Sequence, residues 1–192
     1  MAPTGARVLC LLGPDGPAMW QVFRESPEHL DGGAHPLDRW SHRVIEALAG
    51  TMGATALFPF GGPPWQPFQR WAARGEGAVQ SPVGLQVTGR RGLWASYRGA
   101  LAFFEDFDIP EPEDSQPCLD CPAPCLSACP IGAFADGRYD VASCVDFTDH
   151  AAGTACRSGC RARVSCPHGT GLNLPEAQRE FHMTAFRNAN RV

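Results

Sequence analysis

The sequence predicts a mixed α/β or α+β domain followed by a small cysteine-rich module. Short apolar runs typical of strands alternate with amphipathic segments typical of helices along the first part of the chain. Of the nine cysteines, one lies in residues 1–117 and the others lie in 118–166. Six carboxylates within residues 105–114 indicate an exposed connector. We therefore expect domains at 1–117 and 118–170, and a C-terminal helix within 171–192 that packs back on the body.

Four apolar runs are candidate strands. Each is short and bounded by glycine, proline or polar residues, as strand ends commonly are. The first run is expected to be buried, so its cysteine, Cys10, is expected to be a buried apolar residue. The last two runs lie on either side of a turn at residues 89–92. The four runs are residues 7–12, 54–60, 83–88 and 98–104.

Three segments are candidate helices. Apolar residues recur every three to four positions from Leu37 to Leu48, which predicts a helix over residues 38–49. We expect Asp38 to cap its start and Gly50 to terminate it. The other two candidates are residues 63–73, which begin at a proline pair, and residues 175–187, which are expected to bury Phe181 and Ala185.

Composition and charge narrow the classes of function. All 16 basic residues are arginine and the formal net charge is −4. Without lysine, the chain has no side-chain amine for a Schiff base and no phosphate-loop lysine, and its acidic balance argues against nucleic acid as a partner. No apolar run approaches the ~18 residues of a membrane span, and residues 8–12 are too few for a signal-peptide core. We expect a cytoplasmic protein that does not bind membranes.

The cysteines fall into two groups that each end in Cys-Pro. The first has the spacing C-x2-C-x3-C-x3-C-P, one residue longer than the bacterial ferredoxin run C-x2-C-x2-C-x3-C-P. The second has the looser internal spacings x11, x3 and x5. Closely spaced cysteines let one loop place three thiolates on a cubane cluster, and in two-cluster proteins the fourth cysteine binds the other cluster.

This pattern predicts two [4Fe–4S] clusters with crossed ligation. One cluster alone with spare thiols, zinc in one or both sites, and a disulfide scaffold remain as alternatives. Arginines 157, 161 and 163 flank the second group and either offset the cluster charge or are simply exposed. His150 and His168 are candidates for hydrogen bonds to sulfur or for proton transfer. The expected ligand sets are Cys118, Cys121, Cys125 and Cys166 for the first cluster, and Cys129, Cys144, Cys156 and Cys160 for the second.

Residues 58–166 resemble the epoxyqueuosine reductase and reductive dehalogenase group of iron–sulfur enzymes. The stretches that carry the resemblance are residues 71–87, residues 94–103, the acidic connector, both cysteine groups, and Cys144-Val-Asp-Phe-Thr-Asp-His150. The resemblance implies a nitroreductase-like α/β sandwich core that holds cobalamin, followed by a ferredoxin-like two-cluster module that supplies electrons. Residues 58–64 carry no carboxyl group where that family places its proton donor, so epoxyqueuosine itself is not the expected substrate.

The segment after the second candidate strand is the candidate ligand site. Phe58 to Pro64, with Trp65 and Phe68, forms either a flat wall for a planar ligand or an ordinary proline-rich core loop. The candidate cofactor-binding residues are Phe60, Gly61, Trp65 and Arg98.

Two functions follow from these patterns. The first is a reductase whose clusters, reduced by a partner protein, pass electrons to a cobalamin-like or other planar ligand held by residues 1–117. The second is a ferredoxin-like electron carrier that has no substrate of its own and uses its N-terminal domain to dock a partner. A corrinoid or flavin retained on the purified protein discriminates between them.

Overall fold

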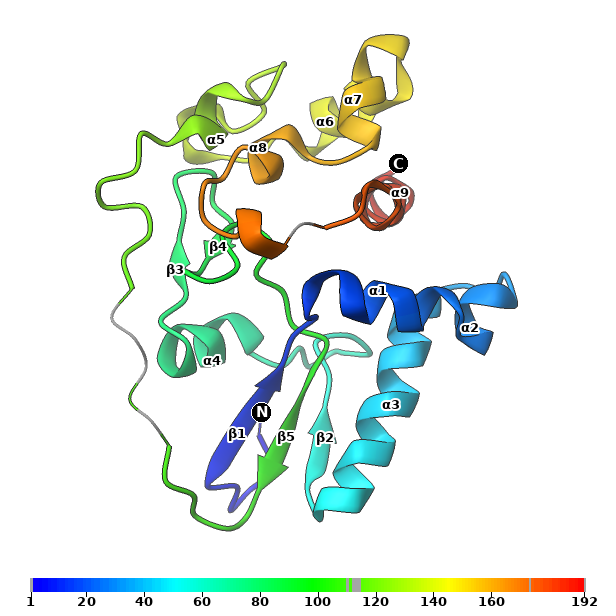
Figure 1. Ribbon diagram of the computed structural model, residues 1–192, viewed down its shortest axis with the longest axis vertical. Coiled ribbons are helices and arrows are strands. Elements are labelled where there is room, and N and C mark those ends of the chain that lie inside the picture. Colours follow the sequence, from blue (N-terminus) through cyan, green and yellow to red (C-terminus); the bar gives the residue numbers. More distant parts are fainter. Residues whose placement is uncertain (1, 110, 112–114, 173, 192) are drawn as a thin grey trace. The chain divides into compact units, whose positions relative to one another are not determined.

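The computed structural model describes residues 2–109, 111, 115–172 and 174–191 (Figure 1). The chain divides into two compact units, of which the first comprises Met1–Gly77 and Ser96–Glu113 and the second Ala78–Ala95 and Asp114–Val192. Residues 78–95 thus belong with the cysteine-rich segment and not with the rest of 1–117. In the acidic connector, the described residues 105–109 and 111 are exposed, as predicted, whereas residues 110 and 112–114 lie outside the described residues.

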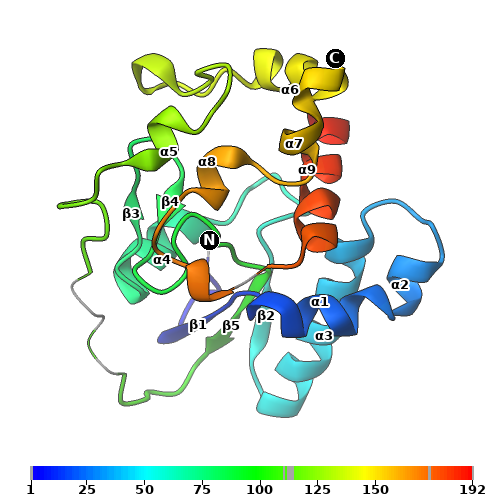
Figure 2. The ribbon, with the colours of Figure 1, turned by 45° about the horizontal axis from the view of Figure 1, so that its top comes forward.

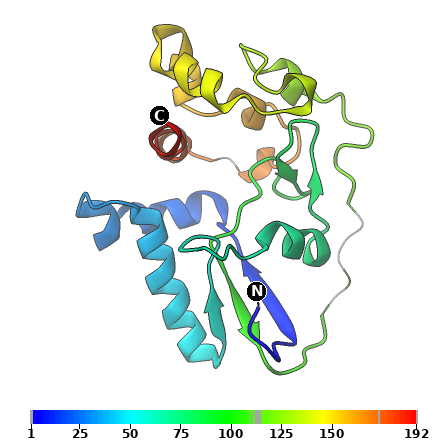
Figure 3. The ribbon, with the colours of Figure 1, turned by 180° about the vertical axis from the view of Figure 1, so that it is seen from behind.

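The first unit is built on a three-stranded antiparallel sheet. Its strands are β1 (Val8–Leu12), β2 (Thr55–Leu57) and β5 (Gly99–Phe103), in the order β1-β5-β2 (Figure 3). The central strand pairs Leu101 with Cys10 on one side and with Ala56 on the other. The strand that comes last in this unit is therefore the one buried between the other two.

Helices cover both faces of this sheet. Helix α3 (Pro36–Met52) packs Ile45 and Ala49 on Leu101 from one side. Helix α4 (Phe68–Gly75) places Phe68 against Leu57 on the opposite side. The short helices α1 (Gly16–Arg24) and α2 (Pro27–Leu30) join α3 through aromatic contacts such as Phe23 with Trp40, whose ring centroids lie 5.7 Å apart.

Helix α3 is longer than the apolar pattern predicts. It runs through Gly50 and ends at Gly53, whose φ of 65° suits glycine and closes the helix. The prediction that Asp38 caps the helix is wrong, because the helix begins two residues earlier at Pro36, and its N-cap residue, His35, makes no side-chain cap hydrogen bond. The Asp38 carboxylate instead accepts a hydrogen bond from Arg98. Helix α4 likewise begins at Phe68, after the proline pair and not at it.

Cys10 is exposed, which contradicts its predicted burial. It lies on the edge strand β1, on the same face as Leu101, with which it pairs. Helix α3 covers that face over β2 and β5, so the edge strand stays open. The apolar composition of β1 did not reveal this, because exposure at an edge depends on which strands a helix covers.

The two candidate strands on either side of residues 89–92 belong to different sheets. Residues Gln86–Val87 form β4, which pairs with β3 (Val79–Gln80) in a separate two-stranded sheet of the second unit. The predicted turn at residues 89–92 does form, because Thr88 and Gly92 make an isolated antiparallel bridge across it. The chain then leaves this hairpin and returns to the first unit as β5.

Short helices make up most of the second unit. The long helix α9 (Glu176–Asn190) packs on α6 (Val141–Asp149) and α7 (Thr154–Arg157) (Figure 2). It buries Gln178 and Met183, whereas Phe181 is half-buried and Ala185 is exposed, so its predicted inner face is only partly correct. The remaining elements are α5 (Pro124–Ser127), α8 (Arg161–Val164) and three 3-10 turns at Ala135–Gly137, Ala151–Gly153 and Thr170–Leu172.

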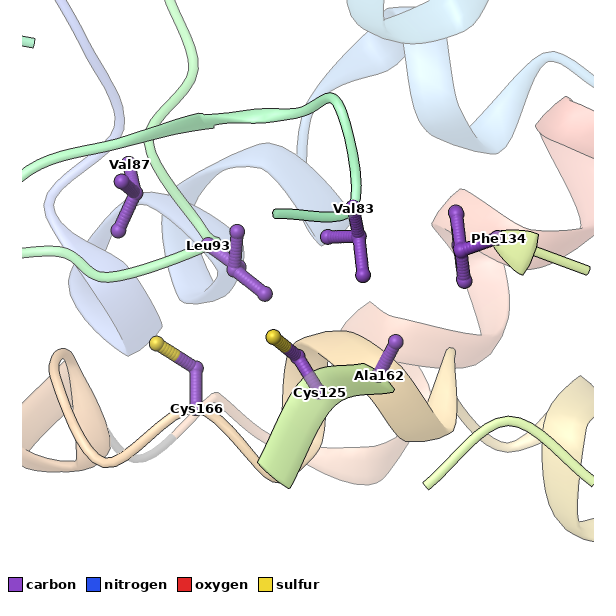
Figure 4. Packing of buried hydrophobic residues seen from close by; sticks show 7 residues of the cluster. All are labelled: Val83, Val87, Leu93, Cys125, Phe134, Ala162 and Cys166. Carbon is purple, nitrogen blue, oxygen red and sulfur yellow. The ribbon is translucent and has the colours of Figure 1, made fainter. Parts of the chain in front are cut away.

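The core of the second unit mixes apolar side chains with cysteines. Figure 4 shows the sulfurs of Cys125 and Cys166 directed towards Leu93 and Val83, which come from the β3–β4 region. The hairpin and the cysteine segment are thus two halves of one core. Within the described residues, no helix is both long enough and apolar enough to span a membrane.

Candidate functional site

The first predicted cysteine set surrounds one small pocket in the second unit. The pocket has a volume of about 10 Å³. Three of its cysteines come from the run around α5, and the fourth, Cys166, comes from the segment after α8, some 40 residues later in the chain. Apolar residues from the hairpin close it. Its lining consists of Cys118, Cys121, Cys125, Cys166, Ser81, Pro82, Val87, Leu93, Ala123, Pro124, Pro167 and His168.

Backbone contact holds this pocket closed. A Cβ atom added to Gly92 would lie 1.8 Å from the carbonyl oxygen of His168 and 3.0 Å from the sulfur of Cys166. A Cβ atom on Gly169 would lie 2.3 Å from the carbonyl oxygen of Arg91. The end of the hairpin therefore lies directly against the Cys-Pro-His-Gly segment, and glycine is required on both sides of the contact.

The thiols of this set act electrostatically on one another. Burial first, and then the thiolates of Cys121, Cys125 and Cys166, raise the pKa of Cys118. Burial and Cys166 likewise raise the pKa of Cys125. Thiols that resist ionisation, as Cys118 and Cys125 do here, favour a bound cation, since a metal stabilises the thiolate form.

The second predicted set is also brought together. Burial and the neighbouring thiolates of Cys160, Cys129 and Cys144 raise the pKa of Cys156, and Cys160 and Cys129 act in the same way on Cys144. Cys129 thus belongs electrostatically with the later cysteines, although it lies in the first run. Its sulfur accepts a hydrogen bond of 3.3 Å from the backbone N–H of Ala133.

The three arginines near the second set have different surroundings. Arg157 donates to the carbonyl oxygens of Thr148 and His150 at 2.6 and 2.9 Å, which is a structural role. Arg161 favours the thiolate of Cys156 through its charge. Arg163 is half-buried, with its guanidinium 5.7 Å from the ring centroid of Trp94.

The two candidate histidines also differ. His150 is exposed, and its Nδ1 lies 2.8 Å from the carbonyl oxygen of Asp146 in α6. His168 lines the first cysteine pocket. His150 does not line that pocket.

The donor sets fit iron–sulfur clusters in their chemistry. Each consists of four thiols, the ligand type that iron–sulfur clusters and structural zinc sites share. Among the described residues, no three His, Cys, Asp or Glu side chains are arranged to hold a single metal ion. The first pocket encloses about as much space as one water molecule, so a cluster between its thiols would spread them apart.

A larger pocket lies in the first unit at the start of α3. Its volume of about 590 Å³ is within the usual range for small-molecule sites. Three of the four predicted cofactor-binding residues line it, namely Phe60, Gly61 and Trp65. The other lining residues all come from the first turns of α3 or the residue before them, and they are His35, Asp38, Arg39, His42 and Arg43.

One wall of this pocket is a stack of flat groups. The imidazole of His42 stacks on Phe58 at 4.8 Å, and Phe58 in turn contacts Phe60 at 5.2 Å. The guanidinium of Arg98 lies 5.3 Å from the centroid of Phe60. The Trp65 indole packs against Gly62, where a Cβ atom would lie 2.8 Å from the ring. Phe68, the other aromatic candidate for this wall, is instead a core residue beneath the sheet.

Arg98, the fourth candidate, supports the wall without lining the pocket. Its Nε donates to the hydroxyl of Ser41 at 3.0 Å, and its Nη2 donates to the Asp38 carboxylate. These bonds hold the guanidinium in place above Phe60. We therefore assign Arg98 to the positioning of Phe60 and Asp38.

The cationic side chains of the pocket are already paired. Arg39 bonds both carboxylate oxygens of Asp31 at 2.7 Å, which lowers the pKa of Asp31 to about 2. Arg43 bonds both oxygens of Glu28 at 2.5 and 2.9 Å, which lowers the pKa of Glu28 to about 2. With these charges compensated, the aromatic stack and the histidines carry recognition, which suits a planar ligand over a multiply charged one.

The fold and its sites define a two-unit α+β protein with two four-cysteine sets in one unit and an aromatic-walled pocket in the other. The chain matches no protein family model, no curated protein and no solved structure. Its function is therefore inferred from the geometry of these sites.

Sequence reasoning missed several residues of the sites, among them His35 and Arg43 of the larger pocket, as well as Tyr139 and His42. Tyr139 donates a hydrogen bond of 3.3 Å to the sulfur of Cys144, and His42 belongs to the aromatic stack. Tyr139 lies five residues before Cys144, a proximity that was available as a signal. For His42 no signal existed, because its partner Phe58 comes from a different element.

Proposed function

We propose that this protein is an iron–sulfur reductase that carries two [4Fe–4S] clusters and passes electrons to a planar ligand held in its first unit. The proposal is supported by the pocket that Cys118, Cys121, Cys125 and Cys166 line together, and by the charge of Cys129, which acts on Cys144 and Cys156 of the later run. An exchange of Cys129 and Cys166 between the two runs would be the pattern of two-cluster ferredoxins. Thiolate ligands would hold the clusters, which supply one-electron transfer when bound.

The metal content tests the first half of this proposal. Purified without oxygen, the protein is expected to contain about eight irons and about eight acid-labile sulfides per chain, because each cubane contains four of each. Iron and sulfide are measured colorimetrically, and zinc by elemental analysis. Zinc without sulfide would overturn the redox function and indicate a zinc-stabilised binding protein. Four irons with four sulfides would leave one cluster and contradict the two-cluster assignment.

The pocket at the start of α3 supports the second half of the proposal, which is that the first unit holds a planar ligand. Its volume admits a flat ring system of moderate size, and a corrinoid would extend beyond it. The ligand is expected to stack on Phe60 and Trp65, which line the pocket, since offset aromatic contacts stabilise flat molecules against such surfaces. Hydroxocobalamin and FMN are the two probes to titrate separately.

Replacement of the most exposed wall residue tests this pocket. We expect Trp65→Ala to weaken binding of whichever probe binds by about tenfold, the loss expected for one stacking partner. Calorimetric titration measures the affinity. Phe107→Ala is the matched control, because Phe107 is also an exposed aromatic residue of the first unit but contacts Phe103, outside the pocket. Equal affinities of Trp65→Ala and the unaltered protein would show that the probe binds elsewhere.

The second candidate function is that of a ferredoxin-like carrier. It is favoured by two exposed leucines next to the first cysteines, since Leu119 and Leu126 are 74% and 46% exposed. Apolar residues exposed beside a redox site suit contact with a partner protein. Clusters that exchange electrons with a partner, in a protein that binds neither hydroxocobalamin nor FMN, would favour this function over the reductase.

A further inference from the structure

A tyrosine hydroxyl faces the second cysteine set. The Tyr139 Oη donates to the sulfur of Cys144 at 3.3 Å. Its ring lies between Phe134 and Phe186, with centroid distances of 4.7 and 5.9 Å and interplanar angles of 23° and 15°. The two stacks hold the phenol in one orientation, so the hydroxyl has little freedom to turn away from sulfur.

A half-buried cation lies near the same set. The guanidinium of Arg163 lies over the ring of Trp94, and burial lowers its pKa while the negative charge of Cys160 opposes that effect. Among the described residues, no carboxylate forms an ion pair with Arg163. Partial burial of a cation without a negative partner is unfavourable, because the cation loses part of its hydration. An anionic group at Cys160 would offset this cost.

The first cysteine set has different surroundings. Its pocket is lined by prolines, Val87 and Leu93, with Ser81 and His168 as the polar side chains apart from the thiols. Backbone N–H groups of Cys125 and Leu126 face the Cys125 sulfur. Among the described residues that line this pocket there is no arginine and no tyrosine. An added negative charge is therefore less well stabilised here than at the second set.

We propose that Tyr139 and Arg163 are positioning residues that raise the reduction potential of the second cluster above that of the first. The inference rests on the proposed function, because it concerns the clusters that the two cysteine sets would hold. Reduction adds one electron to a cluster that already carries net negative charge. A hydrogen bond to a ligating sulfur and a nearby cation stabilise the reduced form most, which raises the potential.

The electron balance of this scheme is simple. One electron leaves a redox partner protein and enters the first cluster, and the same electron then passes to the second, so that one cluster is oxidised as the other is reduced. No covalent bond breaks and no proton is required. In the experiment, dithionite replaces the partner as the reductant.

Tyr139→Phe tests the inference, because it removes only the hydroxyl and leaves the two ring stacks. We expect the ratio of reduced to oxidised second cluster, at a fixed solution potential, to fall about tenfold, equivalent to about 59 mV for a one-electron couple. Redox titration followed by electron paramagnetic resonance measures both clusters in one sample. Cys144→Ser identifies the second cluster, since it removes a ligand of that set alone. The first cluster is expected to keep its potential.

Matched variants separate this role from a structural one. Tyr97→Phe is the control, because Tyr97 is the only other tyrosine in the sequence and its hydroxyl bonds Glu76 in the first unit. Arg163→Gln is expected to lower the potential of the second cluster, and Arg163→Lys, which restores the charge, to recover most of it. These arginine variants also keep the test informative if Tyr139→Phe does not fold.

Two unfavourable outcomes are distinguishable. Unaltered protein without iron and sulfide would overturn the proposed function and this inference together. Protein with two clusters whose potentials are unchanged in Tyr139→Phe and Arg163→Gln, or shifted equally for both clusters, would overturn this inference alone.

Discussion

Replacing Cys129 by serine is expected to remove the second cluster and leave the first. The iron content should fall from about eight to about four per chain, and the resonance of the first cluster should remain. The reason is the placement of this thiol. Cys129 lies in the first run, yet its charge acts on Cys144 and Cys156 and is not among the influences on Cys118 or Cys125. Iron analysis together with electron paramagnetic resonance measures the effect.

Cys166→Ser provides the complementary experiment. Cys166 lines the pocket with Cys118, Cys121 and Cys125, so its loss should damage the first cluster and spare the second. Cys10→Ser is the control, because Cys10 is exposed on β1 in the first unit and should leave both clusters unchanged. Loss of the first cluster in Cys129→Ser would contradict the exchange of ligands and favour one cluster per run.

Replacing Gly92 by alanine is expected to destabilise the second unit by about 4 kcal/mol. Close packing against backbone that cannot move away costs about 3 kcal/mol, and a non-glycine residue at positive φ adds about 1 kcal/mol. The new Cβ atom would lie 1.8 Å from the His168 carbonyl oxygen. We expect the thermal midpoint of the second unit to fall by about 20 °C, with loss of the first cluster, because Cys166 would be displaced together with this segment.

Gly132→Ala isolates the effect of the close contact. Gly132 has a φ of 62°, close to the 52° of Gly92, but a Cβ atom there would meet nothing within 4 Å. Its cost should be that of the backbone conformation alone, about 1 kcal/mol. A thermal midpoint equal in the two variants, measured by circular dichroism under anaerobic conditions, would show that the hairpin does not press against residues 168–169 as the structure has it.

Local sequence is sufficient for much of this protein. Spacing identifies the two cysteine groups, because the ligands of one loop are close in the chain. Apolar periodicity locates α3, because a helix that packs on a sheet must repeat its apolar face every three to four residues. The aromatic and glycine composition of residues 58–65 marks the wall of the pocket in the first unit, where Phe60, Gly61 and Trp65 lie.

Contacts between distant segments decide the rest. Residues 83–88 have the composition of a strand, but their composition does not say which strand they pair with. In the structure Gln86–Val87 pair with β3, whereas β5 pairs with β1 and β2. The sequence suggests that Asp38 caps a helix, but in the structure its carboxylate accepts a hydrogen bond from Arg98, which is 60 residues away in the chain. The apolar neighbours of Cys10 suggest burial, but Cys10 is exposed because helix α3 covers β2 and β5 and leaves the edge strand β1 open.

The same distinction applies to the candidate cluster sites. The number of cysteines and their spacing along the chain are local properties, and they can be read directly from the sequence. The surroundings of each cysteine set depend on residues distant in the chain. Tyr139 packs against Phe186 of α9, and Arg163 lies over Trp94 of the hairpin region. Charge stabilisation depends on distance and burial in three dimensions, so only the tertiary structure distinguishes an apolar first set from a second set that faces a phenol and a cation.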